Sequence, residues 1–302
     1  MTSEKKQAVL DGIEASIARL ANETDTYRQS EQWKNILRTM SQFHAYSFQN
    51  QLAILWQRPS ASRVAGFQTW KSLGRHVVKG AAGIAILAPV MVKLKDKKGP
   101  TTTTECSESK VEKSSLFFRT VYVFDYADTE GAPLDGFSLA QVTEDYGMFP
   151  LVLAAVESLG IKVALEPIAN PCMSGFSEGG RITIKETLAA GEMASVLIHE
   201  AAHELLHWGD QKDIGDALGR KMREVEAEST AFAVMEYLGI ESTADQYLAL
   251  NGANGKIIKA SLGRIRNAVS KLIAAIEEQR GTQRASVQSN QADEGEVLAL
   301  AA

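Results

Sequence analysis

The 302-residue sequence predicts an α+β protein of two domains, a small mixed N-terminal domain and a mainly helical C-terminal domain with a small sheet. Three observations support this prediction. Apolar residues recur at helical spacing near both ends of the chain, two runs of β-branched and aromatic residues lie in the first half, and helical patterns dominate after a Gly-Ala-Pro stretch. We therefore predict domains at 1–135 and 136–280, followed by a disordered tail at 281–302.

The N-terminal domain is expected to begin with helices and to continue as a small antiparallel sheet. Residues 4–22 carry apolar side chains every three or four positions, and a second helical stretch covers about 30–56, with an interruption at an aromatic cluster. The apolar run 84–92 and the aromatic run 116–124 predict two paired strands. The polar segment between them, 93–115, is expected to be a mobile loop.

The C-terminal domain is expected to alternate briefly between helix and strand and then to become helical. The patterns predict a helix at 139–159, strands at 162–166 and 181–185, and helices at about 188–208, 222–238 and 256–280. The strand at 181–185 alternates as an exposed edge strand does, so it is a candidate surface for an extended substrate backbone, with ordinary packing as the alternative. The chain from 281 is rich in Gln, Ser and acidic residues, which favours disorder.

The composition excludes several classes of protein. Apolar residues make up 45% and charged residues 23% of the chain, which is typical of a globular protein. The two cysteines, Cys106 and Cys172, cannot build a disulfide framework or a thiolate zinc cluster. The sequence shows neither a signal peptide nor a run of about 18 apolar residues. We therefore expect a cytoplasmic protein with no membrane partner.

The most specific motif is His199-Glu200-Ala201-Ala202-His203 within an apolar helical stretch. Positions four apart on a helix lie one above the other, so both imidazoles can bind a single ion. Zinc is the expected ion, with Mn²⁺ or another divalent ion as the alternative. Glu200 lies beside that ion and is the expected general base toward a water molecule. The competing interpretation is a chance pattern in which the histidines are simply packed.

A third ligand is expected from the next acidic helix, residues 223–239. Glu224 and Glu228 share one face with small alanines, which let this helix approach the histidine helix. We favour Glu224 as the ligand and Glu228 as the carboxylate that orients an imidazole N–H, with the reverse assignment left open. Glu226 is expected on a solvated face. His207 cannot converge on the same ion from a straight helix, so we expect it to be structural or to orient a ligand.

The charge is distributed unevenly along the chain. The net charge is −5, but residues 1–135 carry 18 Lys and Arg against 14 Asp and Glu, and no acidic residue lies between Glu31 and Asp96. This asymmetry indicates a surface that binds a polyanion.

Aromatic residues are interleaved with these cations between residues 43 and 80. Cations follow a phosphate backbone and aromatic faces stack on unpaired bases, so the combination suits single-stranded nucleic acid better than duplex. The alternative is that the aromatic residues form the core of a small domain. The candidate DNA-binding residues are Tyr46, Asn50, Arg58, Arg63, Phe67, Trp70, Lys71, Arg75 and Lys79.

These motifs resemble a known family. The stretch from Val64 to Val90, which includes Val-Ala-Gly-Phe-Gln-Thr-Trp-Lys-Ser-Leu-Gly-Arg-His, closely resembles the N-terminal domain of the ArdC antirestriction proteins. Further matches are Tyr46-Ser47 with Asn50, and Val123-Phe124-Asp125 with Thr129-Glu130-Gly131. The second half resembles the accompanying metallopeptidase domain, which is related to the ImmA/IrrE and SprT-like zinc peptidases. The resemblance covers about residues 5–280.

The resemblance implies a single-stranded-DNA-binding N-terminal domain and a zincin-like C-terminal domain. It also implies a role in protecting incoming plasmid DNA from host restriction during conjugation, with an unknown protein substrate for which the host restriction machinery is one candidate. The family motif maps onto His199, Glu200 and His203, and its acidic helix onto Glu224 and Glu228. An extra acid in that helix is a departure from the pattern. The alternatives are a DNA-shielding protein with a non-catalytic metal site and a stress-response metallopeptidase regulator.

Overall fold

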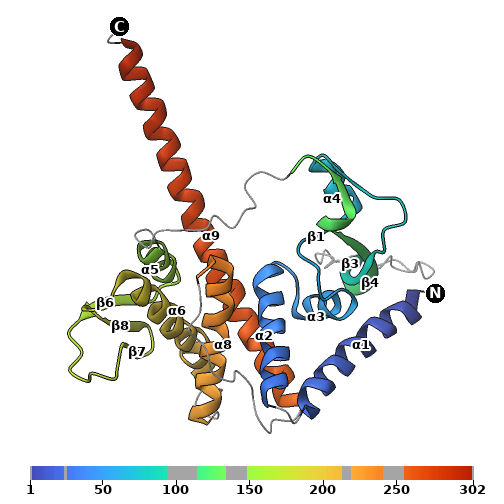
Figure 1. The fold of residues 1–302 in the computed structure, drawn as a ribbon, viewed down its shortest axis with the longest axis horizontal. Helices are drawn as coiled ribbons and strands as arrows, with labels where there is room; N and C mark the ends of the chain where they lie inside the picture. Colours follow the sequence, from blue (N-terminus) through green and yellow to red (C-terminus); the bar gives the residue numbers. More distant parts are fainter. Residues whose placement is uncertain are drawn as a thin grey trace, which may run out of the picture. The chain divides into compact units, whose positions relative to one another are not determined.

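The chain folds into helices and strands in this computed structural model, which describes residues 2–23, 26–93, 114–133, 148–212, 219–240 and 255–300 (Figure 1). The chain divides into two units. Unit 1 comprises Met1–Ala15 and Leu52–Ala132, and unit 2 comprises Ser16–Gln51 and Pro133–Ala302. The predicted mixed α/β class with two-domain organisation is thereby confirmed.

Unit 1 is built around a small antiparallel sheet. The unit also includes helix α1 (Thr2–Asn22) up to Ala15 and helix α3 (Phe48–Gln57) from Leu52 onward. The remaining elements are β1 (Val64–Gly66), α4 (Phe67–Ser72), β2 (Arg75–Val77), β3 (Ile84–Lys93), β4 (Ser114–Asp125), the 3-10 turn η1 (Tyr126–Asp128) and β5 (Thr129–Gly131). The three-stranded sheet has the order β1-β4-β3, and β2 pairs with β5.

The predicted pairing of the two long strands is confirmed. Strands β3 and β4 are antiparallel, with Ile84 opposite Val123 and Lys93 opposite Ser114. Most of the loop predicted at 93–115 lies outside the described residues. The core face of the pair buries Ile84, Ile86 and Val123, which fits their β-branched character.

Unit 2 is mainly helical. Its elements are α2 (Thr26–Gln42), α5 (Met148–Ser158), β6 (Lys162–Glu166), β7 (Gly175–Ser177), β8 (Arg181–Lys185), α6 (Ala190–His207), the 3-10 turn η2 (Gly209–Gln211), α8 (Arg220–Leu238) and α9 (Gly255–Leu300), together with parts of α1 and α3. Helices α6 and α8 lie side by side, and the sheet packs on another flank of α6 (Figure 1).

Close packing of α6 against α8 depends on small side chains. Ala201 and Ala202 on α6 and Ala227 and Ala231 on α8 are at most 1% exposed. Alanine at these positions lets two helix backbones approach and so brings the polar side chains beside them within reach of one another.

Residues 16–51, which the sequence placed in the N-terminal domain, belong to unit 2 in the structure. The reason is the amphipathic helix α2, which buries Trp33 against α8. The Trp33 Nε1–H donates a hydrogen bond of 2.9 Å to Ser229 Oγ. The structure divides the units after Ala132, three residues before the end predicted for the N-terminal domain at residue 135.

Two further expectations for unit 2 differ from the structure. The strand at 181–185 was expected at an edge, but β8 is central in the order β6-β8-β7, parallel to β6 and antiparallel to β7. The chain from 281 was expected to be disordered, whereas α9 continues to Leu300, since no proline interrupts this stretch of helix-compatible residues. Of the helix predicted at 139–159, the part before Met148 lies outside the described residues.

No helix in the part of the chain that the structure describes has both the length and the apolar character needed to cross a bilayer.

Candidate metal centre and nucleic-acid surface

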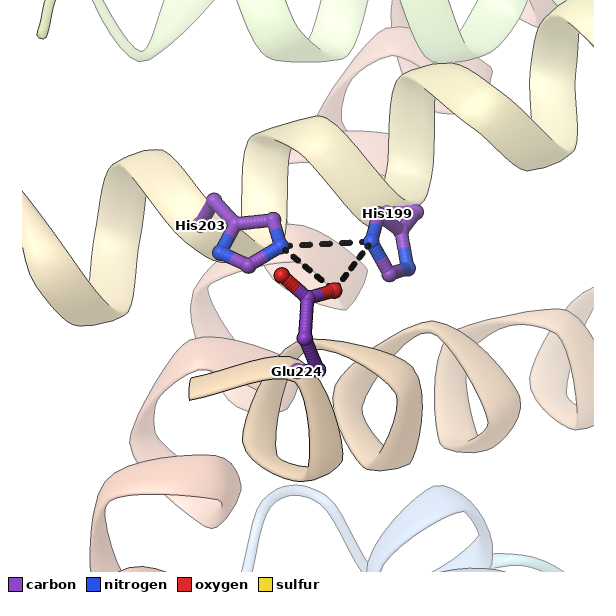
Figure 2. Close-up of side chains that lie close together, drawn as sticks. All are labelled: His199, His203 and Glu224. Carbon is purple, nitrogen blue, oxygen red and sulfur yellow. Dashed lines mark hydrogen bonds and ion pairs between the residues drawn. The ribbon is translucent and has the colours of Figure 1, made fainter. Parts of the chain in front are cut away.

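Three side chains of unit 2 converge on one point (Figure 2). His199 and His203 project from successive turns of α6, and Glu224 reaches toward them from the first turns of α8. The two Nε2 atoms lie 3.2 Å apart. Glu224 Oε2 lies 3.7 Å from Nε2 of His199 and 3.6 Å from Nε2 of His203.

This triangle fits a divalent ion. Three ligands at about 2.0–2.2 Å from one ion, at tetrahedral angles, lie roughly 3.3–3.6 Å from one another. The measured separations bracket this value, and two imidazoles with one carboxylate are a donor set that zinc accepts. His199, His203 and Glu224 would therefore hold the ion.

A cavity of about 330 Å³ opens beside the triangle. The apolar side chains of Met173, Phe176 and Trp208 line it, and so do Arg220 and Arg223 at the start of α8. The fourth position of an ion held by the three ligands is thus accessible to a small molecule or to an extended chain. An open fourth position distinguishes catalytic from structural zinc sites.

Glu200 lines the same cavity and is only 9% exposed. Burial raises the pKa of its carboxyl group, while the neighbouring His199 and a hydrogen bond with Ser177 oppose that shift. Ser177 belongs to β7, the short edge strand, so the carboxylate lies between the histidine helix and the edge of the sheet. A carboxylate in this place can accept a proton from a water at the site.

A second carboxylate touches the opposite side of the His199 ring. Glu228 Oε2 lies 3.1 Å from His199 Nδ1, one helical turn beyond Glu224 on α8. The structure therefore places Glu224 beside the two Nε2 atoms and Glu228 beside Nδ1 of His199. Carboxylates in the latter position fix the tautomer and the orientation of a ligating imidazole.

The three side chains shift one another's pKa values in opposite directions. Burial lowers the pKa of His199, but hydrogen bonds with Glu224 and Glu228 outweigh it, and the pKa is raised to about 9. Burial and the charge of His199 lower the pKa of His203 to about 4. A hydrogen bond with His199 lowers the pKa of the Glu224 carboxyl group to about 2.

The structure overturns the solvated position expected for Glu226, which is 0% exposed. Its carboxylate contacts His207 at the end of α6, and it contacts Ser261 and Arg264 because α9 packs against α8. His207, 4% exposed, lies between Glu226 and His203 and does not reach the triangle. Sequence reasoning missed this buried acid.

Sequence reasoning also missed Glu204, the residue after the second histidine. Its two carboxylate oxygens accept hydrogen bonds of 2.8 and 2.6 Å from the backbone N–H groups of Gly179 and Gly180. Both glycines have left-handed φ angles, 82° and 90°, which suit glycine. Glu204 thereby anchors the β7–β8 turn to α6 and fixes the edge strand beside the site.

The candidate DNA-binding residues of unit 1 do not form one surface. Trp70 is 2% exposed, and its Nε1–H donates to the Phe124 carbonyl at 2.8 Å. Arg75 is 5% exposed and donates to Thr129 and to the carbonyls of Gly131 and Ala132. We therefore remove both residues from the candidate set, since their polar groups are already used inside the unit.

Four other candidates are buried or already have contacts within their own unit. Arg58 pairs with Asp128 and lies 3.4 Å from Asp125, and Arg63 stands 5.9 Å over the Tyr126 ring. In unit 2, Asn50 is buried, and the carbonyl of Tyr46 accepts a hydrogen bond of 2.6 Å from Arg266.

Three candidates remain exposed in unit 1, namely Phe67, Lys71 and Lys79. Phe67 and Lys71 belong to the same short helix α4, and Phe67 is 52% exposed. Exposed aromatic rings that the sequence did not single out lie on β4, at Phe118 and Tyr122. Their alternation along a strand gave no sign of which face would be covered.

Two family models match the chain. Residues 4–124 match the model described as the N-terminal domain of anti-restriction factor ArdC. Residues 156–238 match the model described as the IrrE N-terminal-like domain, a range that contains His199, His203 and Glu224.

Individual relatives are distant. An uncharacterized protein of Bacillus anthracis is 25% identical over 91% of this chain, which spans about half (51%) of that relative's length. The metal-free crystal structure of the antirestriction ArdC protein from the R388 plasmid is 16% identical, with 78% of this chain and 84% of that chain covered and a TM-score of 0.47. The Mn(II)-bound structure is 15% identical, with 82% and 96% covered and a TM-score of 0.39. Both TM-scores lie below 0.5, so the superpositions establish no detailed correspondence.

Proposed function

Since residues 4–124 belong to the family of ArdC N-terminal domains and residues 156–238 to the IrrE-like family, we propose that the chain is an antirestriction protein with two activities. Unit 1 binds single-stranded DNA, and unit 2 hydrolyses a peptide bond in a protein substrate. Together they protect incoming plasmid DNA from host restriction during conjugation.

The observation that carries the hydrolytic half is the convergence of His199, His203 and Glu224 beside an open cavity. A divalent ion held there would polarise a substrate carbonyl and acidify a water molecule. Glu200 accepts the proton of the attacking water and passes it to the leaving amine. Its burial favours this role, because a raised pKa lets the carboxyl group both accept and return the proton.

The edge strand β7 supports an extended substrate. Gly175, Phe176 and Ser177 line the cavity, and β7 has β8 on one side only among the described strands. An extended peptide can pair with such an edge through main-chain hydrogen bonds and present its carbonyl to the ion. This assigns to β7 the role that the sequence suggested for β8.

The DNA-binding half is supported by the exposed residues of unit 1. Phe67 and Lys71 on α4 offer one stacking surface and one cation, and Lys79 adds a second cation. Single-stranded DNA is the favoured ligand because stacking needs unpaired bases.

The test uses the full chain in conjugative transfer of an unmodified plasmid into a restricting host. We expect Glu200→Gln to abolish protection while metal content and oligonucleotide affinity stay unchanged. Glu192→Gln, an exposed acid in the first turn of the same helix, is the matched control and should behave as the wild type. Full protection by Glu200→Gln would refute the hydrolytic half and leave a DNA-shielding protein. Equal affinity for single- and double-stranded oligonucleotides would refute the DNA-binding half.

A further inference from the structure

A chain of buried polar contacts leads from the metal centre to the C-terminal helix. Nδ1 of His203 lies 3.2 Å from Nδ1 of His207, and Nε2 of His207 lies 3.2 Å from Oε2 of Glu226. Ser261 Oγ donates to Glu226 at 2.5 Å, and Arg264 forms an ion pair with the same carboxylate. These contacts join α6, α8 and α9.

When His203 binds an ion through Nε2, only one placement of the ring hydrogens gives every one of these contacts a donor and an acceptor. A neutral imidazole that ligates through Nε2 carries its hydrogen on Nδ1, so His203 donates to Nδ1 of His207. That nitrogen must then be an acceptor, which places the hydrogen of His207 on Nε2. His207 in turn donates to Glu226, which must be an ionised acceptor and is kept so by Arg264 and Ser261.

The two histidine ligands are therefore held by different means. His199 is held by Glu228, whose side chain is 37% exposed. His203 is held through His207, 2% exposed, and Glu226, 0% exposed. A buried chain of this kind is screened little by water, so it constrains the ring more strongly than an exposed carboxylate does.

We propose that Glu226 is a positioning residue for the metal centre, acting through His207 on the ring of His203, and that Ser261 and Arg264 make α9 part of the same centre. The inference rests on the metal centre of the proposed function. It goes beyond that function because it assigns a role in metal affinity to Glu226, which touches neither candidate ligand. It assigns the same role to Ser261 and Arg264, which lie on α9, outside the range that the IrrE-like family model matches.

A purely structural role for Glu226 makes a different prediction. If the carboxylate served only to join α8 to α9, its loss would lower stability without any selective effect on metal binding. Tyr237 offers the matched control, because its hydroxyl forms a hydrogen bond with Glu277 that also joins α8 to α9 but lies outside the chain of contacts to His203.

The experiment measures the Zn²⁺ dissociation constant of the full chain by competition with a chromophoric chelator. We expect Glu226→Gln and His207→Phe to weaken binding by about 10–100-fold, the usual effect of losing an outer partner of a ligand. Tyr237→Phe should remain within about twofold of the wild type, since it leaves the ligands' partners intact. His207→Gln, which keeps an acceptor oxygen and a donor amide, should bind more tightly than His207→Phe, and it serves as the second variant if Glu226→Gln fails to fold.

A spectroscopic readout separates positioning from packing. Long-range ¹H–¹⁵N correlation of the zinc-loaded wild type should show His207 as the neutral tautomer with hydrogen on Nε2. Hydrogen on Nδ1 of His207, or unchanged zinc affinity in the Glu226 and His207 variants, would overturn the relay while the metal centre stands. A wild-type chain that binds no zinc would instead overturn the metal centre, and the relay with it.

Discussion

The candidate metal centre in unit 2 and the predicted DNA-binding residues, most of which lie in unit 1, were predicted from different kinds of sequence pattern. The two candidate histidine ligands share one helix at a spacing of four, and a single further carboxylate completes the triangle. The DNA candidates were chosen by composition, and the structure disperses them among core, ion pair and surface. Helical spacing fixes where a side chain points, whereas composition does not.

Trp70→Ala should destabilise unit 1 by about 3–5 kcal/mol, because it leaves a large cavity and removes the hydrogen bond to Phe124. Lys71→Ala on the next position is exposed and should change stability by less than about 0.5 kcal/mol. Hydrogen exchange of peptides from residues 64–131 in the full chain reports both. A stable Trp70→Ala variant with reduced DNA affinity would restore Trp70 to the binding surface.

His203→Ala should weaken zinc binding by roughly 3 kcal/mol, about 100-fold, since each ligand supplies a similar share of the binding free energy. Oligonucleotide affinity should not change, because the substitution lies in the other unit. Isothermal titration with Zn²⁺ and with labelled single-stranded DNA measures the two quantities on one preparation. Retention of full zinc affinity would mean that His203 is packed and not a ligand.

Phe67→Ala should weaken binding of single-stranded DNA by about 1–3 kcal/mol through loss of stacking. The double change Lys71→Ala and Lys79→Ala should act differently and reduce the slope of log K against log[salt] by about 1.4, or 0.7 for each cation. Fluorescence anisotropy across a salt series distinguishes the two effects. If all three changes leave binding intact, the exposed rings Phe118 and Tyr122 on β4 become the next candidates.

The sequence predicted much of the fold because its strongest signals are local. The strands at 162–166 and 181–185 have the predicted bounds, and the helix pair of the metal centre follows from periodicity and alanine placement. The position of β8 inside the sheet was missed because its neighbour β7 is a three-residue strand, Gly-Phe-Ser, without any β pattern of its own. Such a strand exists only through its tertiary pairing.

The burial of Glu226 was missed for the same reason, because it depends on a helix that is distant in the sequence. Glu226 lies about 200° around α8 from Glu224, so helical geometry places it on the opposite face, where solvent is the default neighbour. What covers that face is α9, whose Ser261 and Arg264 are more than thirty positions along the chain. Local pattern predicted which side chains would converge, whereas the contacts that support them depend on which distant helix packs behind them.

Gly175→Ala tests the edge strand β7, which the sequence patterns did not predict, and we expect it to change stability less than Trp70→Ala does. A Cβ atom at Gly175 would lie 2.7 Å from Val196 Cγ1 and 3.1 Å from the Thr183 carbonyl, so β7 must move away from α6. We expect a loss of about 1–2 kcal/mol and faster exchange in β7, with zinc affinity preserved because the ligands stay on α6 and α8. Gly219→Ala, where an added Cβ meets nothing within 4 Å, is the matched control. If Gly175→Ala lowered zinc affinity instead, the edge strand would belong to the metal centre itself, and the contrast between spacing-encoded ligands and their tertiary surroundings would no longer hold.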